Sequence, residues 1–354
     1  MKKLTKQQKS NLITLAMVVC FYLICEIFIR TGLMSSHLKG LLVPLTYYAI
    51  AAVGLNLCVG ILGELSLGHA GFMCIGAFSS SIFSVMTRDA LPTVPRFILA
   101  FIIGVAMTAL LGFLIGIPVL RLNGDYLAIV TLAFGEIIKN ILNAVYMGVD
   151  DKGLHLSLKD AASMGLDAST GKKIINGAMG ITGTPSDSNF TIAIIILLVS
   201  LIIVQNLVQS RDGRAIMSIR DNRIAAESTG INVTKYKMLA FTISAAIAGA
   251  AGVLFSHNIS TLTAQGIYFG YNASIMLLVY VVLGGIGNIR GSVIAAMILY
   301  VLPELLRGMD KYRMLIYSIV LIVMMLFNWS PKAIEFRQNH LSKFSKRFRK
   351  EAAR

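Results

Sequence analysis

Residues 238–289 form a run of 52 residues that contains no Asp, Glu, Lys or Arg. A helix that crosses the hydrocarbon core of a bilayer needs about 20 mostly apolar residues, so this run is too long for one crossing. Glycine and small polar residues interrupt it over residues 256–270. We therefore expect two membrane spans here, at residues 238–255 and 271–283.

The remainder of the chain has the same character. Only 14% of all residues are charged, against about 25% in an ordinary soluble protein, so a large soluble domain is excluded. The sequence predicts an all-α, polytopic transmembrane helical bundle of about ten spans. The other eight spans are expected at residues 11–29, 41–63, 65–87, 97–120, 126–149, 190–208, 291–306 and 314–329.

Two regions are too rich in glycine to be assigned as plain spans, namely residues 65–87 and the pair of segments that flank Arg290. Non-helical backbone is tolerated at membrane depth only where protein buries it or where it lines a cavity. Each of these regions is therefore either a full span or a broken, re-entrant helix.

Basic residues indicate the orientation. The net charge of +15 would suggest a nucleic-acid partner in a soluble protein. Here the basic residues lie at both ends and between apolar runs, where the positive-inside rule explains them, and no nucleic-acid partner is expected. Four lysines precede residue 10, six basic residues lie in 211–237 and eight follow residue 329. Ten spans place all three groups, and both termini, in the cytoplasm.

These boundaries define the expected domain organisation. A transmembrane domain occupies residues 1–329, and its first apolar stretch is a retained span because no small-residue cleavage site follows it. The external loop, residues 148–189, is too short for a folded domain and is expected to form a partly ordered cap. Residues 209–237 form a cytoplasmic loop. The basic tail, residues 330–354, is either solvated or an amphipathic segment on anionic lipid.

The cytoplasmic loop carries the signals of a short helix. Asp221 or Asn222 is a suitable N-cap, because either side chain accepts hydrogen bonds from free backbone N–H groups. Gly230 suits the left-handed position that ends a helix. About eight residues lie between them, and so short a helix is marginal alone in water. The pattern favours either a docking element or an ordinary basic loop.

If the helix is a docking element, Ala225 and Ala226 give it a smooth face that a partner's groove can approach closely. Charged residues around that face would fix the orientation of the partner. These are Arg220, Asp221, Arg223 and Glu227.

Polar residues inside the apolar spans are the candidates for a substrate path. Glu136 and Lys139 lie three apart on one helix face and are expected either to neutralise each other or to serve the path. Asn56, His69 and Asn140 are weaker candidates, since such residues more often bond a neighbouring helix. His69 ranks first among these because the glycines around it allow helices to approach closely.

No catalytic site, metal site or cofactor is expected. The four cysteines form no CxxC pair, and we find no His-rich, paired-carboxylate or Ser/His/Asp arrangement that would indicate an integral membrane enzyme. The chain also lacks the G-x-x-x-x-G-K-S/T phosphate loop of ATPases.

The spacing Ala225-Ala226-x-x-x-Gly230 resembles the coupling-loop signature of ATP-binding cassette (ABC) importer permeases, although Ile224 stands where that signature has Glu. The wider loop resembles the form in branched-chain amino acid permeases. Three further stretches, residues 63–78, 124–136 and 284–291, resemble motifs of LivM-type permease subunits of these importers. The resemblance covers roughly residues 41–329.

This resemblance implies a type II-like importer permease in the bacterial plasma (inner) membrane that translocates leucine, isoleucine and valine. Its short loop helix would sit in a cleft of an ABC ATPase subunit, which would hydrolyse the ATP. The other implied partners are a homologous LivH-like permease, an extracytoplasmic substrate-binding protein and membrane lipids. A permease for urea, amides or simple sugars and, from another class, a secondary transporter or channel remain alternatives.

Overall fold

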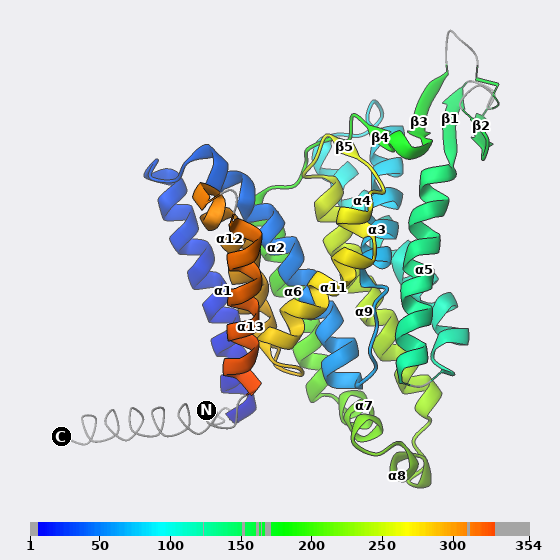
Figure 1. Ribbon diagram of the computed structural model, residues 1–354. Helices are drawn as coiled ribbons and strands as arrows, with labels where there is room; N and C mark the ends of the chain where they lie inside the picture. Colours follow the sequence, from blue (N-terminus) through cyan, green and yellow to red (C-terminus); the bar gives the residue numbers. More distant parts are fainter. Residues whose placement is uncertain are drawn as a thin grey trace. The chain divides into compact units, whose positions relative to one another are not determined.

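The computed structural model describes residues 6–122, 124–150, 153–160, 163, 165–166, 171–309 and 312–329 (Figure 1). The chain divides into two compact units, residues 1–297 and 298–354, with the boundary inside helix α12. The predicted basic tail, residues 330–354, lies outside the described residues.

Ten helices of the described chain match the ten expected spans in order. By length and composition, eight segments are suited to cross a membrane, when η1 (Leu57–Leu62) is joined to α2 and α10 (Gly266–Phe269) to α11. The remaining two, α12 and α13, have 17 residues each. The ten helices are α1 (Lys6–Arg30), α2 (Ser36–Asn56), α3 (His69–Met86), α4 (Thr93–Val119), α5 (Asp125–Ala144), α6 (Phe190–Gln209), α9 (Val233–Ser256), α11 (Tyr271–Gly284), α12 (Ile289–Leu305) and α13 (Arg313–Trp329).

The core of the first unit is built from α2, α3 and α9, which are the most deeply buried of the spanning helices. Glycines let their backbones approach closely, as is usual between transmembrane helices. A Cβ added to Gly76 of α3, for example, would lie 2.7 Å from Gly249 Cα of α9. Helix α4 turns large apolar side chains such as Phe113 outward, as a helix that faces lipid does.

Two irregular segments, which we call breaks, connect consecutive spans. Helix α2 continues into η1, a six-residue π-helix, which ends at Gly63 with φ +82°. Residues 63–68 are not helical, and α3 begins only at His69. We call residues 63–68 the first break. Residues 65–68 belong to this break, but His69–Met86 is one continuous helix that is long and apolar enough to cross a membrane. Of the two alternatives for residues 65–87, the structure therefore favours a span, which begins four residues later than expected.

The second break, residues 257–270, separates α9 from α11 and contains the strand β5 (Thr261–Leu262) and the short helix α10. The interruption expected at residues 256–270 is confirmed in place. Helix α11 is consequently only 14 residues long.

A small antiparallel sheet extends α5 at the end of the bundle opposite to the loop helices α7 and α8 (Figure 1). Its strand order is β2-β1-β3. The expected span at residues 126–149 was too long, because its last residues pair as strand β1 instead of continuing the helix. The strands are β1 (Tyr146–Asp150), β2 (Gly153–Ser157) and β3 (Lys172–Asn176), and a separate pair joins β4 (Ile181–Thr182) to β5.

Candidate functional site

The loop between α6 and α9 folds into two short helices, α7 (Arg211–Asp221) and α8 (Arg223–Ser228). Asn222, rather than Asp221, is the N-cap of α8 and accepts from the Ala225 N–H at 3.0 Å. Gly230 has φ +82°, a conformation that glycine adopts without strain. The helix between these residues is thus present, with six residues instead of about eight.

Ala226 does not belong to an exposed face, and this corrects the smooth docking face expected from the sequence. It is 3% exposed and packs with Ile219 of α7 and Val233 of α9. Ile224, on the other hand, is 80% exposed, and Ala225 is exposed beside it. The sequence indicated the two alanines but not which one packs inward, because that depends on where α7 and α9 lie.

The charges around α8 also differ from the expectation. Arg223 pairs with Glu227 along the helix at 3.2 Å, and both side chains are about half exposed. Arg220 instead binds within the chain: its Nη1 donates to the Gly60 carbonyl of η1 at 2.9 Å, and its Nε donates to Asp221 Oδ1 at 3.0 Å. Arg220 and Asp221 therefore have partners inside the chain.

An ion pair that sequence reasoning missed holds the first break. Lys237 of α9 binds Glu64, and their side chains are only 4% and 13% exposed. The carbonyl of Glu64 accepts from the Cys58 thiol at 3.4 Å. The sequence signal was a lone charge at the edge of each apolar run, but nothing in it pairs residues that are 173 positions apart.

Asn56 and His69 are both fully buried and bridge helices. Asn56 donates to Ser292 Oγ at 2.8 Å and accepts from the Gly287 N–H at 2.9 Å. Both residues were expected as weak substrate-path candidates, and neither has a surface open to a substrate in this conformation.

His69 lies between two serines, with Nδ1 3.1 Å from Ser66 Oγ and Nε2 2.7 Å from Ser244 Oγ. Because the Ser244 hydroxyl donates to the Gly54 carbonyl, it accepts from Nε2–H. The neutral tautomer protonated at Nε2 therefore satisfies every partner. The polar residues were identified from the sequence, but their partners were not.

Glu136 and Lys139 of α5 form an ion pair, with side chains 24% and 15% exposed. The other carboxylate oxygen of Glu136 accepts from the Tyr271 N–H at 2.7 Å, so this residue caps the start of α11. Tyr271 is 51% exposed and Asn140 is also exposed. The structure thus brings Glu136, Lys139 and Tyr271 together at a side surface of the bundle.

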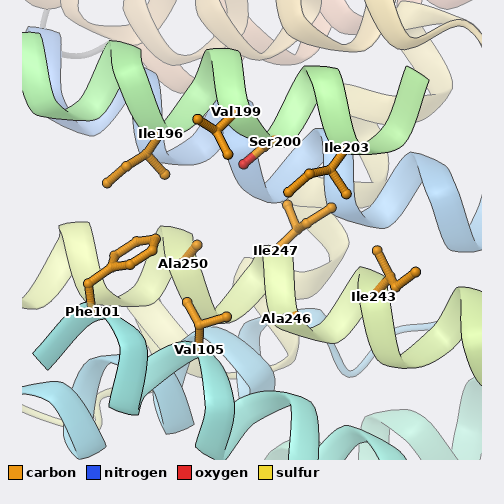
Figure 2. Close-up of a pocket in the computed structure, with 10 residues that line it drawn as sticks. All are labelled: Phe101, Val105, Ile196, Val199, Ser200, Ile203, Ile243, Ala246, Ile247 and Ala250. Atoms are coloured by element: carbon orange, nitrogen blue, oxygen red, sulfur yellow. The ribbon is translucent and has the colours of Figure 1, made fainter. Parts of the chain in front are cut away.

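A groove of about 340 Å³ runs between α4, α6 and α9 (Figure 2). Apolar side chains line almost all of it, and the Ser200 hydroxyl is the exception among its lining groups. A charged or zwitterionic ligand would lose its hydration there without gaining hydrogen bonds, so the groove suits hydrocarbon chains. It is lined by Phe101, Val105, Ile196, Val199, Ser200, Ile203, Ile243, Ala246, Ile247 and Ala250.

Comparison with known proteins adds the following. Residues 38–327 match the family model described as the permease component of branched-chain amino acid transport systems. The chain is 34% identical to the high-affinity branched-chain amino acid permease LivM of Salmonella typhimurium, over 81% of this chain and 67% of that protein.

Two more distant relatives match over most of their own length. LivH of the same organism is 26% identical over 73% of this chain and 81% of its own length. The fructose import permease FruG of Bifidobacterium longum is 26% identical over 86% of each chain. No solved structure matches the chain.

Proposed function

The chain belongs to the family of permease components of branched-chain amino acid transport systems, and on this premise we propose that it is the membrane-spanning subunit of an ATP-driven importer for leucine, isoleucine and valine. The observation that carries the ATP-driven part is α8, a capped six-residue helix outside the apolar spans that presents an exposed isoleucine, Ile224. Such a helix gains stability when a partner covers it.

The partner that fits α8 is a cytoplasmic ATPase subunit. Ile224 is the apolar anchor, and the Arg223–Glu227 pair beside it fixes the orientation of the bound partner. This chain has no phosphate loop in its sequence, so the energy comes from the other subunit. The loop and both termini then lie in the cytoplasm, and the small sheet lies outside.

The substrate path follows the side surface where α5 meets α11. Glu136 is the twelfth of the 20 residues of α5, so it lies near half depth of the membrane. Ionisable residues at that depth face protein or a water-filled path, not lipid. Glu136, Lys139 and Asn140 therefore line the path against a second, homologous permease subunit, and we assign Asn56 and His69 to helix packing. An extracytoplasmic binding protein supplies most of the substrate choice.

A permease for simple sugars is the second candidate, and the observation that favours it is the similarity to the fructose permease FruG. The charged pair Glu136–Lys139 favours the amino-acid proposal. A zwitterion offers both an ammonium and a carboxylate to such a pair, whereas a neutral sugar offers hydroxyls.

Two measurements test the proposal. Wild-type protein purified from its own membranes should bring down an ATPase subunit, and Ile224→Asp should release that subunit while the permease remains in the membrane. Leu33→Asp is the matched control, because Leu33 is 74% exposed in the turn between α1 and α2. If no ATPase accompanies the wild type, the ATP-driven proposal fails.

Uptake of labelled leucine, urea and ribose by a deletion strain that carries the gene separates the substrate classes. We expect uptake of leucine only. Uptake of ribose without leucine would support the sugar alternative.

A further inference from the structure

Arg220 connects α7 to the helix that precedes the first break. Its Nη1 donates to the Gly60 carbonyl at 2.9 Å, while its Nε and Nη2 both donate to Asp221 Oδ1, at 3.0 and 2.9 Å. The two contacts with Asp221 fix the plane of the guanidinium group, which directs the remaining donor at Gly60. One rigid side chain therefore spans from the end of α7 to the last turn of η1.

We propose that Arg220 is a positioning residue that transmits movement of α8 to the first break, and not a docking residue for the ATPase. The inference rests on the proposed function, because the ATPase bound to α8 supplies the movement. Helix α8 cannot shift alone: Ala226 packs against Ile219 of α7, and Asn222 is the only residue between the two helices. A displacement of α8 is thus a displacement of Arg220.

The contact at the break is steric as well as polar. A Cβ added at Gly63, the first residue of the break, would lie 2.5 Å from Arg220 Cγ. The stem of Arg220 thus lies directly against the backbone of the break. Packed protein interiors compress little and transmit strain, so a push on Arg220 moves the segment that leads to α3.

The same contact reaches α11. The Gly60 carbonyl lies beside Gly287, where an added Cβ would be 3.4 Å from that oxygen. Gly287 follows the end of α11, and its N–H is held by Asn56 of α2 at 2.9 Å. Movement at Gly60 therefore reaches α11, which flanks the proposed path, through its C-terminal turn. It also reaches α3 through the break, and α3 packs closely against α5, the other helix of the path, since a Cβ added at Gly71 would lie 2.6 Å from Gly135 Cα.

A simpler role would be helix capping. The last carbonyls of a helix lack partners within it, and a cation stabilises that end of the helix dipole. Capping alone predicts that uptake and ATP hydrolysis change together, in proportion to any loss of folded protein. Transmission predicts that ATP hydrolysis and assembly persist while uptake is lost.

The test uses the assembled transporter, with its ATPase and binding protein, reconstituted in vesicles. Arg220→Met nearly keeps the length of the side chain but removes all three hydrogen bonds. We expect the ATPase subunit to co-purify with this variant and to hydrolyse ATP near the wild-type rate. Uptake of labelled leucine should fall about tenfold or more, as for the loss of a coupling energy of ordinary size. Arg220→Lys should recover part of the uptake, since a single ammonium cannot serve Gly60 and Asp221 together.

Arg214→Met is the matched control. Arg214 lies on the same helix and also donates to a helix-terminal carbonyl, that of Gln209 at 3.1 Å, but its bond leads to α6 and not to the break. Loss of the Arg214 bond should leave the uptake of leucine near the wild-type rate. Equal losses of uptake in the two variants, or a parallel loss of ATP hydrolysis in Arg220→Met, would overturn the inference alone. A wild-type transporter without an ATPase would overturn the proposed function and this inference with it.

Discussion

The two breaks between transmembrane helices are held in different ways. The first break is fixed by long charged side chains that arrive from α7 and α9, Arg220 and Lys237. The second is fixed by α5, where Asn143 donates to the Ala264 carbonyl at 3.0 Å and Glu136 accepts from the Tyr271 N–H. Helix α5 also contacts the first break, where Thr131 Oγ1 accepts from the Leu67 N–H at 3.0 Å. The difference is that the first break is in addition connected to the loop helix α7 through Arg220.

This difference suggests that the two breaks have different roles. A buried ion pair is stable in one geometry, and losing either charge is costly. Such a pair suits an element that must transmit movement rigidly. Hydrogen bonds to backbone groups at a partly exposed surface cost less to open. The following four variants probe this contrast, in order of the expected loss of stability, whether of the whole bundle or of a single helix.

Lys237→Met should have the largest effect. It leaves the Glu64 carboxylate buried without its cation, which costs about 3–5 kcal/mol. The free energy of unfolding in detergent, measured by denaturant titration, should fall accordingly. The double variant Lys237→Met with Glu64→Gln should recover most of the loss, because no unpaired charge remains. Equal instability of the single and double variants would show that packing, and not the ion pair, holds the first break.

Asn56→Ala should cause the second largest loss in the free energy of unfolding. It removes the acceptor of the Gly287 N–H and the donor to Ser292 Oγ. A backbone donor that is largely shielded from water and loses its partner costs up to about 1–3 kcal/mol, and the Gly287 N–H is partly buried. Ser292→Ala is the matched control, since it removes one of the two bonds and should cost roughly half as much. A smaller loss in Asn56→Ala than in Ser292→Ala would contradict the assignment of Asn56 as the bridge between α2 and the turn after α11.

Asn222→Ala should destabilise only α8. Loss of an N-cap costs about 0.5–2 kcal/mol of helix stability. Because α8 has only six residues, this loss would unfold the element that docks the ATPase. The yield of co-purified ATPase should drop, while the unfolding free energy of the bundle stays the same. Asn232→Ala removes an equivalent cap, a bond from the Lys235 N–H at 3.0 Å, from the 24-residue α9. That control should leave the ATPase bound.

Glu136→Gln should have the smallest effect on stability, below about 1 kcal/mol, because glutamine still accepts from the Tyr271 N–H and the pair is partly exposed. Uptake of leucine should nevertheless fall. The double variant Glu136→Gln with Lys139→Met separates the two possible roles, since rescue of uptake would indicate simple pairing and no rescue a path. A stability loss as large as that of Lys237→Met would remove the contrast between the two breaks.

The spans were predictable because each is an apolar run of the length that a bilayer demands. The loop helix α8 was predictable because its signals, Asn222 and Gly230, are local: a capping side chain at one end and a left-handed residue at the other. The pair Glu136–Lys139 was foreseen for the same reason, since a spacing of three places two side chains on one face.

What the sequence did not reveal depends on distant contacts. The inward direction of Arg220 becomes visible only when α7 lies against η1, because Arg220 and its partner Gly60 are 160 positions apart. Ala226 was wrongly assigned to the exposed face, because the sequence does not show that Ile219 and Val233 pack against it. The sheet beyond α5 was missed because residues 146–149 are apolar enough to continue a span.

The Lys237–Glu64 pair has a consequence for biosynthesis. The two residues are 173 positions apart, so at 5–20 residues per second the ribosome makes Lys237 about 9–35 s after Glu64. During that interval α2 and α3 can already have entered the membrane, but the carboxylate between them has no cation. We expect the first break to stay in contact with water at the insertion machinery until α9 emerges. The pair of helices α2 and α3 thus completes its insertion only after most of the chain has been translated.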